Sequence, residues 1–299
     1  MVSRSTLFLV LAAFCWGVSG GIGGILMAGG WDPLVVSFYR SAVGLLFVVG
    51  WLVLRPVHTG LKNPRLWLWS VAAGLGVAGN FAFYFVSISH GSVAVSATLM
   101  YCAPVFVYLI SIVFKLETLT ASKSLAMVLV MVGIILLTGV YDIGASGVSA
   151  VSVGAGLLSG LSYALFIFAF KYASKYGSAR AVLSIVFLLS CFILIAVADG
   201  YQLQVALVAP DWALFVGLGV LGAGLSFVLY IIGLRQTAPA VASIVAMVEP
   251  VTASLFGVSL LGQGLSMVQL GGMALILLAV TGMGVVSGSG ESVSYPARS

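Results

Sequence analysis

Long apolar runs, each close to twenty residues, alternate along the chain with short breaks rich in polar residues, Gly and Pro. An apolar run of this length spans the hydrocarbon core of a bilayer when it is helical. We predict ten such helices, at about 5–28, 33–54, 66–89, 92–114, 122–140, 152–171, 180–198, 212–232, 238–260 and 265–286. The predicted fold class is therefore all-α and integral to the membrane.

The composition agrees with this pattern. Hydrophobic residues make up 62% of the 299 residues and charged residues only 6%, whereas a soluble domain carries roughly 25% charged residues. So few charges cannot cover a water-exposed surface, so a lipid bilayer is the expected partner. The cysteines Cys15, Cys102 and Cys191 lie within predicted helices without metal-ligand or C-x-x-C spacing. We therefore predict no disulfide, no metal site and no cofactor.

Two copies of the spacing G-x-G-x-x-G occur, at Gly74–Gly79 and Gly217–Gly222. A dinucleotide-binding loop of this spacing needs a strand before it and a helix N-terminus after it. Both copies instead lie inside apolar helices, where glycine more often lets a second helix approach closely. We interpret them as packing surfaces.

Basic residues lie on one side of the predicted bundle, with Arg40 as the exception. Alternate loops and the two termini carry all the others: Arg4, Arg55, Lys62, Arg65, Lys115, Lys123, Lys171, Lys175, Arg180, Arg235 and Arg298. The opposite loops carry Asp32, Asp142, Asp199 and Asp211 instead. By the positive-inside rule, both termini of this multi-pass inner (cytoplasmic) membrane protein are predicted to be cytoplasmic. The net charge of +5 thus follows from topology, and nothing indicates a nucleic-acid partner.

The second half of the sequence repeats the first. A shift of 146 residues places predicted helices three, four and five on helices eight, nine and ten, and the aligned pairs include Gly76 with Gly222, Tyr84 with Tyr230 and Pro104 with Pro250. We predict one transmembrane domain, residues 1–286, made of repeats 5–140 and 152–286, followed by a disordered polar tail, 287–299. Each repeat has an odd number of helices, so the two repeats are inverted in the membrane. Inverted repeats with a substrate site at their interface are typical of secondary transporters that work by alternating access.

Two segments resemble the EamA repeat of the drug/metabolite transporter superfamily: YFVSISHGSVAVSATLMYCAPVFVYLISIVFKLETLT and YIIGLRQTAPAVASIVAMVEPVTASLFGVSLLGQGLSMVQLGGMALILL. The features that carry the resemblance are the mid-helix Pro, the acidic or amide residue after it (Glu117, Gln263) and the closing Gly-rich helix. The resemblance covers residues 5–286, and within the superfamily the chain looks most like the YddG-type exporters of aromatic amino acids. It implies a ten-helix basket whose cavity is lined by helices one, three, four, six, eight and nine, with helices five and ten at the periphery.

Two charged residues are predicted to lie within the bilayer. Glu249 is near the middle of its helix, where a carboxylate costs about 2.5–3.5 kcal/mol. Its functional interpretation is a ligand for a substrate amine or a proton-coupling group. The alternative is a protonated or ion-paired residue that holds helices together. Arg40 has three candidate partners, namely Glu249, backbone carbonyls and a substrate carboxylate. Since helix two is outside the cavity set that the resemblance implies, we expect Arg40 to be a structural anchor.

Pro104 and Pro250 each remove a helix hydrogen bond, which frees the carbonyls of Met100 and Ala246. Such carbonyls are tolerated in a membrane only where protein or a wet cavity satisfies them. A hinge or cavity wall and a fixed kink are equally good interpretations of both prolines.

Polar and polar-tipped aromatic residues lie at corresponding positions of the two repeats and are our candidates for the cavity wall, where aromatic rings can stack on a planar substrate. The alternative for Tyr and Trp is a belt at the membrane interface. The predicted substrate-binding set is Trp16, Asn80, Tyr84, Tyr101, Tyr163, Tyr230, Ser243 and Glu249.

The predicted function is export of small amphiphilic metabolites, aromatic or other amino acids among them, by a monomer or homodimer. The alternatives are a multidrug or cationic-compound exporter of the same fold and, with less support, an integral-membrane enzyme. The only two histidines, His58 and His90, are both predicted to lie in loops, and the chain has no Walker loop that would indicate ATP-driven pumping. A channel would need rings of charge or a filter loop, which the pattern lacks.

The charge pattern makes a topological prediction. Cysteines introduced at positions 60 and 120 should react with a membrane-impermeant thiol reagent only from the cytoplasm, and those at 145 and 205 only from outside. A consistent reversal would contradict the orientation inferred from the basic residues.

Overall fold

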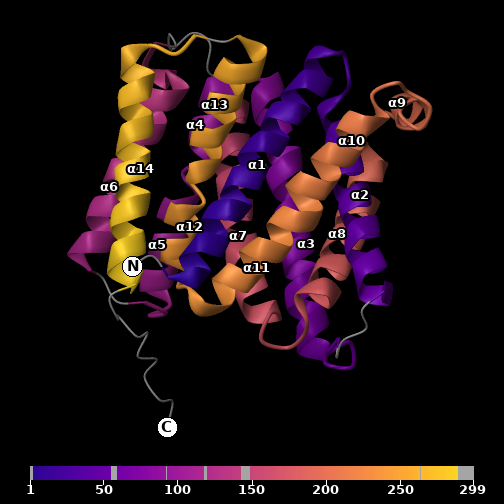
Figure 1. The fold of residues 1–299 in the computed structure, drawn as a ribbon, viewed down its shortest axis with the longest axis horizontal. Coiled ribbons are helices and arrows are strands. Elements are labelled where there is room, and N and C mark those ends of the chain that lie inside the picture. The colour runs from indigo at the N-terminus through magenta and orange to yellow at the C-terminus, as the bar shows by residue number, and fades with distance from the viewer. Residues whose placement is uncertain are drawn as a thin grey trace.

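The computed structural model describes residues 3–54, 59–91, 93–117, 120–142, 149–262 and 264–288, and every regular element among them is helical (Figure 1). The elements are α1 Arg4–Ala28, α2 Pro33–Leu54, α3 Pro64–Ser89, α4 Val93–Met100, α5 Ala103–Val113, α6 Ala121–Thr138, η1 Val140–Asp142, α7 Ala150–Ala173, α8 Ala179–Val197, α9 Gly200–Val205, α10 Trp212–Gly219, η3 Val220–Leu225, α11 Ser226–Gln236, α12 Pro239–Val245, α13 Val248–Leu261 and α14 Met267–Gly288. Arg55, His58, Gln263 and the tail 289–299 lie outside the described residues.

Within the described residues, ten spans are long and apolar enough to cross a membrane, which confirms the predicted fold class. Three of them are not regular helices. The fourth span is divided into α4 and α5, the ninth into α12 and α13, and the eighth contains the π-helical turn η3 between α10 and α11. The loop before the eighth span carries the short helix α9, which projects from the bundle in Figure 1.

Polar residues define where the helices begin. The side chains of Ser3, Thr120, Ser149 and Ser178 accept hydrogen bonds from backbone N–H groups in the first turns of α1, α6, α7 and α8. Asn63 does the same for α3, whose first residue is Pro64. These caps satisfy N–H groups that have no partner inside the helix, so the polar breaks in the sequence also set the helix boundaries.

The main helix contacts between the two repeats have equivalent contacts in which the repeats have exchanged roles. Helix α3 packs along α7, and the corresponding α10–η3–α11 packs along α1; α2 packs on α8 and α6 on α14. Figure 1 shows the last two pairs at opposite sides of the bundle. The fourth and ninth spans also end alike, because Lys115 and Gly262 both adopt left-handed backbone conformations with φ of 52° and 64°. The inverted repeat inferred from the sequence is therefore visible in the tertiary structure.

The glycine motifs lie at close contacts between helices. A Cβ atom on Gly76 would be 2.8 Å from the backbone nitrogen of Phe166 in α7, and one on Gly222 would be 2.6 Å from the hydroxyl oxygen of Ser19 in α1. Both distances are too short for a methyl group. The two motifs are packing surfaces, and they occupy equivalent interfaces of the two repeats.

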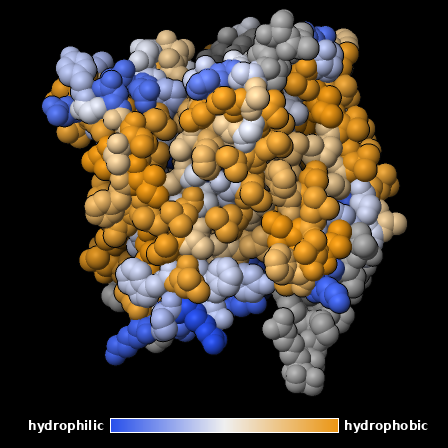
Figure 2. Space-filling view, turned by 180° about the vertical axis from the view of Figure 1, so that it is seen from behind, coloured by the Kyte–Doolittle hydropathy of each residue, from blue (hydrophilic) through white to orange (hydrophobic). Residues whose placement is uncertain are grey.

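The two ends of the bundle differ in charge. We call the end where α1 begins and α11 ends the basic end, because the described loops there carry Lys and Arg, and we call the opposite end, with Asp32, Asp142, Asp199 and Asp211, the acidic end. Figure 2 shows a wide apolar band between hydrophilic residues at top and bottom. Exposed side chains within the spans, such as Leu46, Phe192 and Leu278, suit contact with lipid.

The close approach at Gly76 generates a stability prediction. Gly76→Ala should lower the free energy of unfolding in detergent by about 1–3 kcal/mol, because the methyl group overlaps the α7 backbone. Gly154→Ala in α7 is the matched control: nothing lies within 4 Å of its added Cβ, so it should raise stability by roughly 0.5–1 kcal/mol. Equal effects of the two substitutions would contradict the packing role of the motif.

Candidate substrate cavity

A cavity of about 320 Å³ lies at the centre of the bundle, between helices of both repeats. Its wall is mostly apolar and aromatic, with a few polar groups. It is lined by Trp16, Ser19, Gly20, Gly23, Met27, Val36, Ser37, Arg40, Val77, Asn80, Phe81, Tyr84, Phe85, Val93, Met100, Tyr101, Tyr163, Phe166, Leu218, Phe227, Glu249 and Ala253.

The cavity faces the acidic end. Its wall reaches Met27 near the end of α1 and Val93 at the start of α4, and both side chains are exposed. Toward the basic end the space is filled by the buried side chains of Phe170, Phe187 and Tyr230. Edge-to-face ring contacts join Phe227 to Phe170 and Phe187, at centroid distances of 5.7 and 5.5 Å. An aromatic cluster therefore closes the cavity on the side of the basic end.

Breaks in two helices lie at the level of the cavity floor. The fourth span is interrupted between Met100 and Ala103 and the ninth between Val245 and Val248, in each case just before the proline. At the second break the Glu249 N–H donates to the Ala246 carbonyl over 3.0 Å, so the carbonyl that Pro250 cannot serve keeps a partner. Both predicted helices are interrupted next to their prolines, and whether either break acts as a hinge or as a fixed kink stays a prediction.

Glu249 lies in the first turn of the half-helix α13, and its side chain lines the cavity. The helix dipole makes this end of a helix favourable for a negative charge. The Tyr163 hydroxyl donates a long hydrogen bond of 3.5 Å to Glu249 Oε2. The sequence thus places a carboxylate in the centre of the membrane at one of the few backbone positions that stabilises it.

Arg40 is held by the irregular turn of the eighth span. Its Nε and Nη2 atoms donate to the carbonyl oxygen of Gly222 over 3.0 and 2.8 Å, and its guanidinium lies 5.0 Å from the centre of the Phe81 ring. Gly222 belongs to the π-helical turn η3, where carbonyl groups leave the regular i→i−4 ladder. Of the three predicted partners for Arg40, the structure shows the backbone carbonyl and no ion pair with Glu249 within the described residues, and the substrate carboxylate stays a prediction.

The expectation that helix two lies outside the cavity is wrong. Ser37 and Arg40 both line it, because α2 packs against α10 and η3 and so joins the wall at the acidic end. Gly44 and Gly219 permit this approach, since added Cβ atoms would lie 2.5 Å from Ala223 and 2.4 Å from Val43. Arg40 anchors η3, as expected, but it does so from within the cavity wall.

Most of the predicted substrate-binding residues are brought together. Trp16, Tyr84, Tyr101 and Tyr163 line the cavity, as does Glu249. Asn80 also lines it, although its Nδ2 atom donates to the carbonyl and hydroxyl oxygens of Ser159 at 3.1 Å each and so ties α3 to α7.

Two predicted residues do not line the cavity. Tyr230 is fully buried in the aromatic cluster, with its ring 4.9 Å from that of Trp16. Ser243 is fully buried in α12 and donates to the Ala240 carbonyl over 2.8 Å. Periodicity could not separate these positions from the wall, because the inverted repeats are equivalent in sequence while the cavity opens toward one end only.

Four phenylalanines of the wall were not predicted, namely Phe81, Phe85, Phe166 and Phe227. Phe81 and Phe227 occupy the same place in the two repeats, so the repeat contained a signal for them. These residues were left out because phenylalanine has no polar tip, and only polar or polar-tipped residues were chosen as candidates for the wall.

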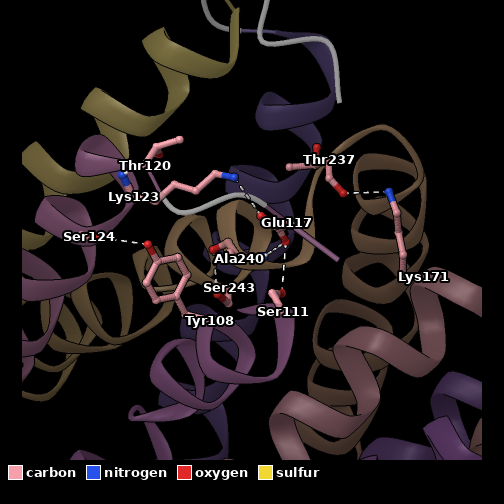
Figure 3. Close-up of polar contacts among 10 residues, drawn as sticks. All are labelled: Tyr108, Ser111, Glu117, Thr120, Lys123, Ser124, Lys171, Thr237, Ala240 and Ser243. Carbon is pink, nitrogen blue, oxygen red and sulfur yellow. Dashed lines mark hydrogen bonds and ion pairs between the residues drawn. The ribbon is translucent and has the colours of Figure 1, made fainter. Parts of the chain in front are cut away.

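A polar network joins the two repeats at the basic end (Figure 3). Glu117 accepts hydrogen bonds from Ser111, from the Ala240 backbone N–H at 3.1 Å and from Lys123 Nζ at 3.0 Å. It thereby caps the N-terminus of α12, where the methyl side chain of the N-cap residue Ala238 cannot accept a hydrogen bond. Beside it, Lys171 donates to the carbonyls of Leu234, Arg235 and Thr237 at the end of α11.

The arrangement agrees with comparisons with known proteins. The model of the EamA-like transporter family matches residues 3–139 and again residues 151–285. The chain belongs to the EamA-like transporter family. An uncharacterized transporter of Archaeoglobus fulgidus is 32% identical over 220 residues, which cover 72% of this chain and 74% of that protein. This member of the EamA-like family is thus a multi-pass membrane transporter.

The fold of the EamA-like protein is also similar to that of a solved crystal structure. The two superpose with a TM-score of 0.77 over 98% of this chain and 100% of the other, at 18% sequence identity. At that identity the likeness concerns the fold alone.

The contacts of Arg40 predict how the protein tolerates loss of Glu249. Breaking a buried ion pair costs about 3–5 kcal/mol, but within the described residues no ion pair joins Arg40 and Glu249. Glu249→Gln should therefore lower the free energy of unfolding by less than about 1 kcal/mol. Arg40→Gln should cost about 1–3 kcal/mol, because the Gly222 carbonyl loses its donors.

Thermal and chemical unfolding in detergent of the two single variants and the double variant would check this. A large loss for Glu249→Gln that is restored in the double variant would show that the two residues stabilise the protein as a pair.

Proposed function

We propose that the protein is a secondary transporter that exports small amphiphilic metabolites, aromatic or other amino acids among them, by alternating access through the central cavity. The observation that carries the proposal is a membrane-centred cavity that contains both aromatic rings and two charged side chains. The resemblance of the sequence to the YddG-type exporters also supports this proposal.

The size and lining of the cavity favour a small substrate. A volume of about 320 Å³ is at the lower limit of ligand pockets, which suits an amino acid better than a large drug. Aromatic rings from both repeats surround this volume, including those of Trp16, Tyr84, Tyr101 and Phe227. They offer stacking and edge contacts to a flat apolar side chain.

The asymmetry between the two ends supports alternating access. The cavity faces the acidic end, while the aromatic cluster and the Glu117 network close the basic end. Because the repeats are inverted, exchanging the packing of the two halves would close the acidic end and open the basic one. The hydrogen bond from the Ala240 backbone N–H to the Glu117 carboxylate joins the two repeats, so this exchange has to break it.

The orientation in the cell belongs to the proposal as well. Basic loops favour the cytoplasmic side, so the basic end and both termini are placed in the cytoplasm of a cell whose inner membrane holds the protein. The cavity then faces outward, as it does in an exporter that has released its substrate. The protein is proposed to act as a monomer or homodimer, without nucleic acid or cofactor.

A cationic-compound exporter of the same fold is the second candidate. Glu249 in the cavity favours it, because a carboxylate attracts an amine. Arg40 in the same wall opposes it, since a guanidinium repels a purely cationic substrate. Neither the cavity nor the family supports an integral-membrane enzyme.

Flux measurements in liposomes test the proposal. The purified protein should transport a labelled aromatic amino acid, and Tyr101→Ala and Trp16→Ala should each reduce that flux severalfold, because they remove rings from the wall. Trp67→Ala, which removes an exposed ring near the start of α3, is the control and should leave flux unchanged. Normal phenylalanine and tryptophan flux in both cavity variants would rule out the aromatic wall, and absence of flux for a whole amino-acid panel in the unmodified protein would rule out the function.

A further inference from the structure

We infer that Arg40 and Glu249 form a zwitterion site, in which Arg40 binds the carboxylate and Glu249 the ammonium group of an α-amino acid. The inference rests on the proposed function and deepens it, because it names the two groups that a substrate must carry. It also assigns to α2, which the sequence placed outside the cavity, a direct part in specificity.

The guanidinium of Arg40 keeps one side available. Its Nε and Nη2 atoms donate to Gly222, and no hydrogen-bond partner for Nη1 occurs in the described part of the chain. A guanidinium presents five N–H donors in a rigid fork and binds carboxylates well. The Gly222 carbonyl and the Phe81 ring hold this fork in place, so an entering carboxylate meets a donor that is already oriented.

Glu249 is likewise incompletely used. Its only side-chain hydrogen bond recorded among the described residues is the long one from Tyr163, at 3.5 Å. A carboxylate offers about four acceptor positions, so Glu249 retains acceptor capacity toward the cavity. An ammonium group carries three donors and no acceptor, which matches this capacity.

The two charges are near each other without being paired. Both side chains line the same cavity of about 320 Å³, yet no ion pair within 4.0 Å joins them in the described structure. Opposite charges that remain apart in a poorly solvated cavity are costly. A ligand that carries a carboxylate and an ammonium group on neighbouring atoms can satisfy both at once, whereas a simple amine or a simple acid satisfies one and leaves the other exposed.

The side chain of the ligand then has a defined place. Phe81 contacts Arg40, while Tyr163 and Tyr101 lie beside Glu249 in the same wall. With its charged end held between Arg40 and Glu249, an amino acid would direct its side chain toward the rings of Trp16, Phe166 and Phe227 on the cavity floor. The charged pair thus selects the class of substrate, and the rings select among its members.

Binding of three related compounds separates the two roles. The probes are phenylalanine, phenethylamine, which lacks the carboxylate, and 3-phenylpropionate, which lacks the ammonium group. The unmodified protein should bind phenylalanine at least about tenfold more tightly than either analogue, as expected for the loss of one charge-assisted hydrogen bond.

The variants should then show opposite patterns. Arg40→Gln should weaken binding of phenylalanine and phenylpropionate about tenfold or more and leave phenethylamine within about twofold. Glu249→Gln should weaken phenylalanine and phenethylamine and leave phenylpropionate within about twofold. Arg180→Gln, at the basic end beside Trp51, and Asp211→Asn, at the acidic end beside Trp31, are the controls and should change none of the three affinities.

A purely structural role of Arg40 predicts something else. Thermal unfolding shows whether the Arg40→Gln protein is folded. If it is folded and the substitution weakens binding of all three compounds equally, or of none, the carboxylate assignment is overturned. If it does not fold, Arg40→Lys replaces it: the ratio of phenylalanine to phenethylamine affinity should fall, and an unchanged ratio overturns the assignment. If Glu249→Gln changes the affinities for phenethylamine and phenylpropionate equally, the ammonium assignment of Glu249 is overturned.

Failure of the proposed function has a different signature. Unmodified protein that neither binds nor transports any amino acid of a panel contradicts the function itself. Protein that transports phenylalanine but treats its two analogues alike contradicts only the zwitterion site.

Discussion

The structure depends on the requirement that every backbone polar group in the hydrocarbon core has a partner. Regular helices meet this requirement internally, and most of the ten spans are regular. The exceptions are the breaks of the fourth and ninth spans and the π turn of the eighth. At the ninth-span break the Ala246 carbonyl accepts from the Glu249 N–H, and in the π turn the Gly222 carbonyl accepts from Arg40. Residues at all three irregular positions line the cavity or supply carbonyls beside it, so the cavity lies where the helices deviate from regular geometry.

Packing between the spans follows from the same solvent. Lipid provides no hydrophobic force between helices, so close contact and polar bonds have to hold them together. Glycine supplies the contact at the equivalent α3–α7 and η3–α1 interfaces, and Asn80 with Ser159 supplies hydrogen bonds at the first of them. The two repeats therefore pack through similar interfaces, which is what the proposed alternating access requires.

Charged residues occur inside this bundle only where a particular contact stabilises them. Glu249 lies at the start of a half-helix, and Arg40 is bonded to a carbonyl of a π turn. Glu117 illustrates the contrasting case at the basic end, where Lys123, Ser111 and the Ala240 N–H use its acceptor positions. Glu117 is a structural carboxylate, whereas Arg40 and Glu249 keep unused hydrogen-bonding groups in a cavity.

The sequence by itself determined the fold class, the ten spans, the two interrupted helices and the meaning of the glycine motifs. Each of these is local, because it depends on hydropathy over about twenty residues or on proline and glycine chemistry. The internal repeat added the inverted topology. Trp16, Tyr84, Tyr101, Tyr163 and Glu249 were also recognisable, since polar-tipped or ionisable groups deep in a span have few other uses.

Only the tertiary structure decided which end of the cavity is open and which helices line it. Both repeats contain nearly the same signals, so Tyr84 and Tyr230 are equivalent along the chain, yet only Tyr84 lines the cavity. The place of Arg40 depends on how closely α2 approaches η3, which the side chains across that interface decide. Such contacts join residues about 180 positions apart, and no local pattern in the sequence encodes them.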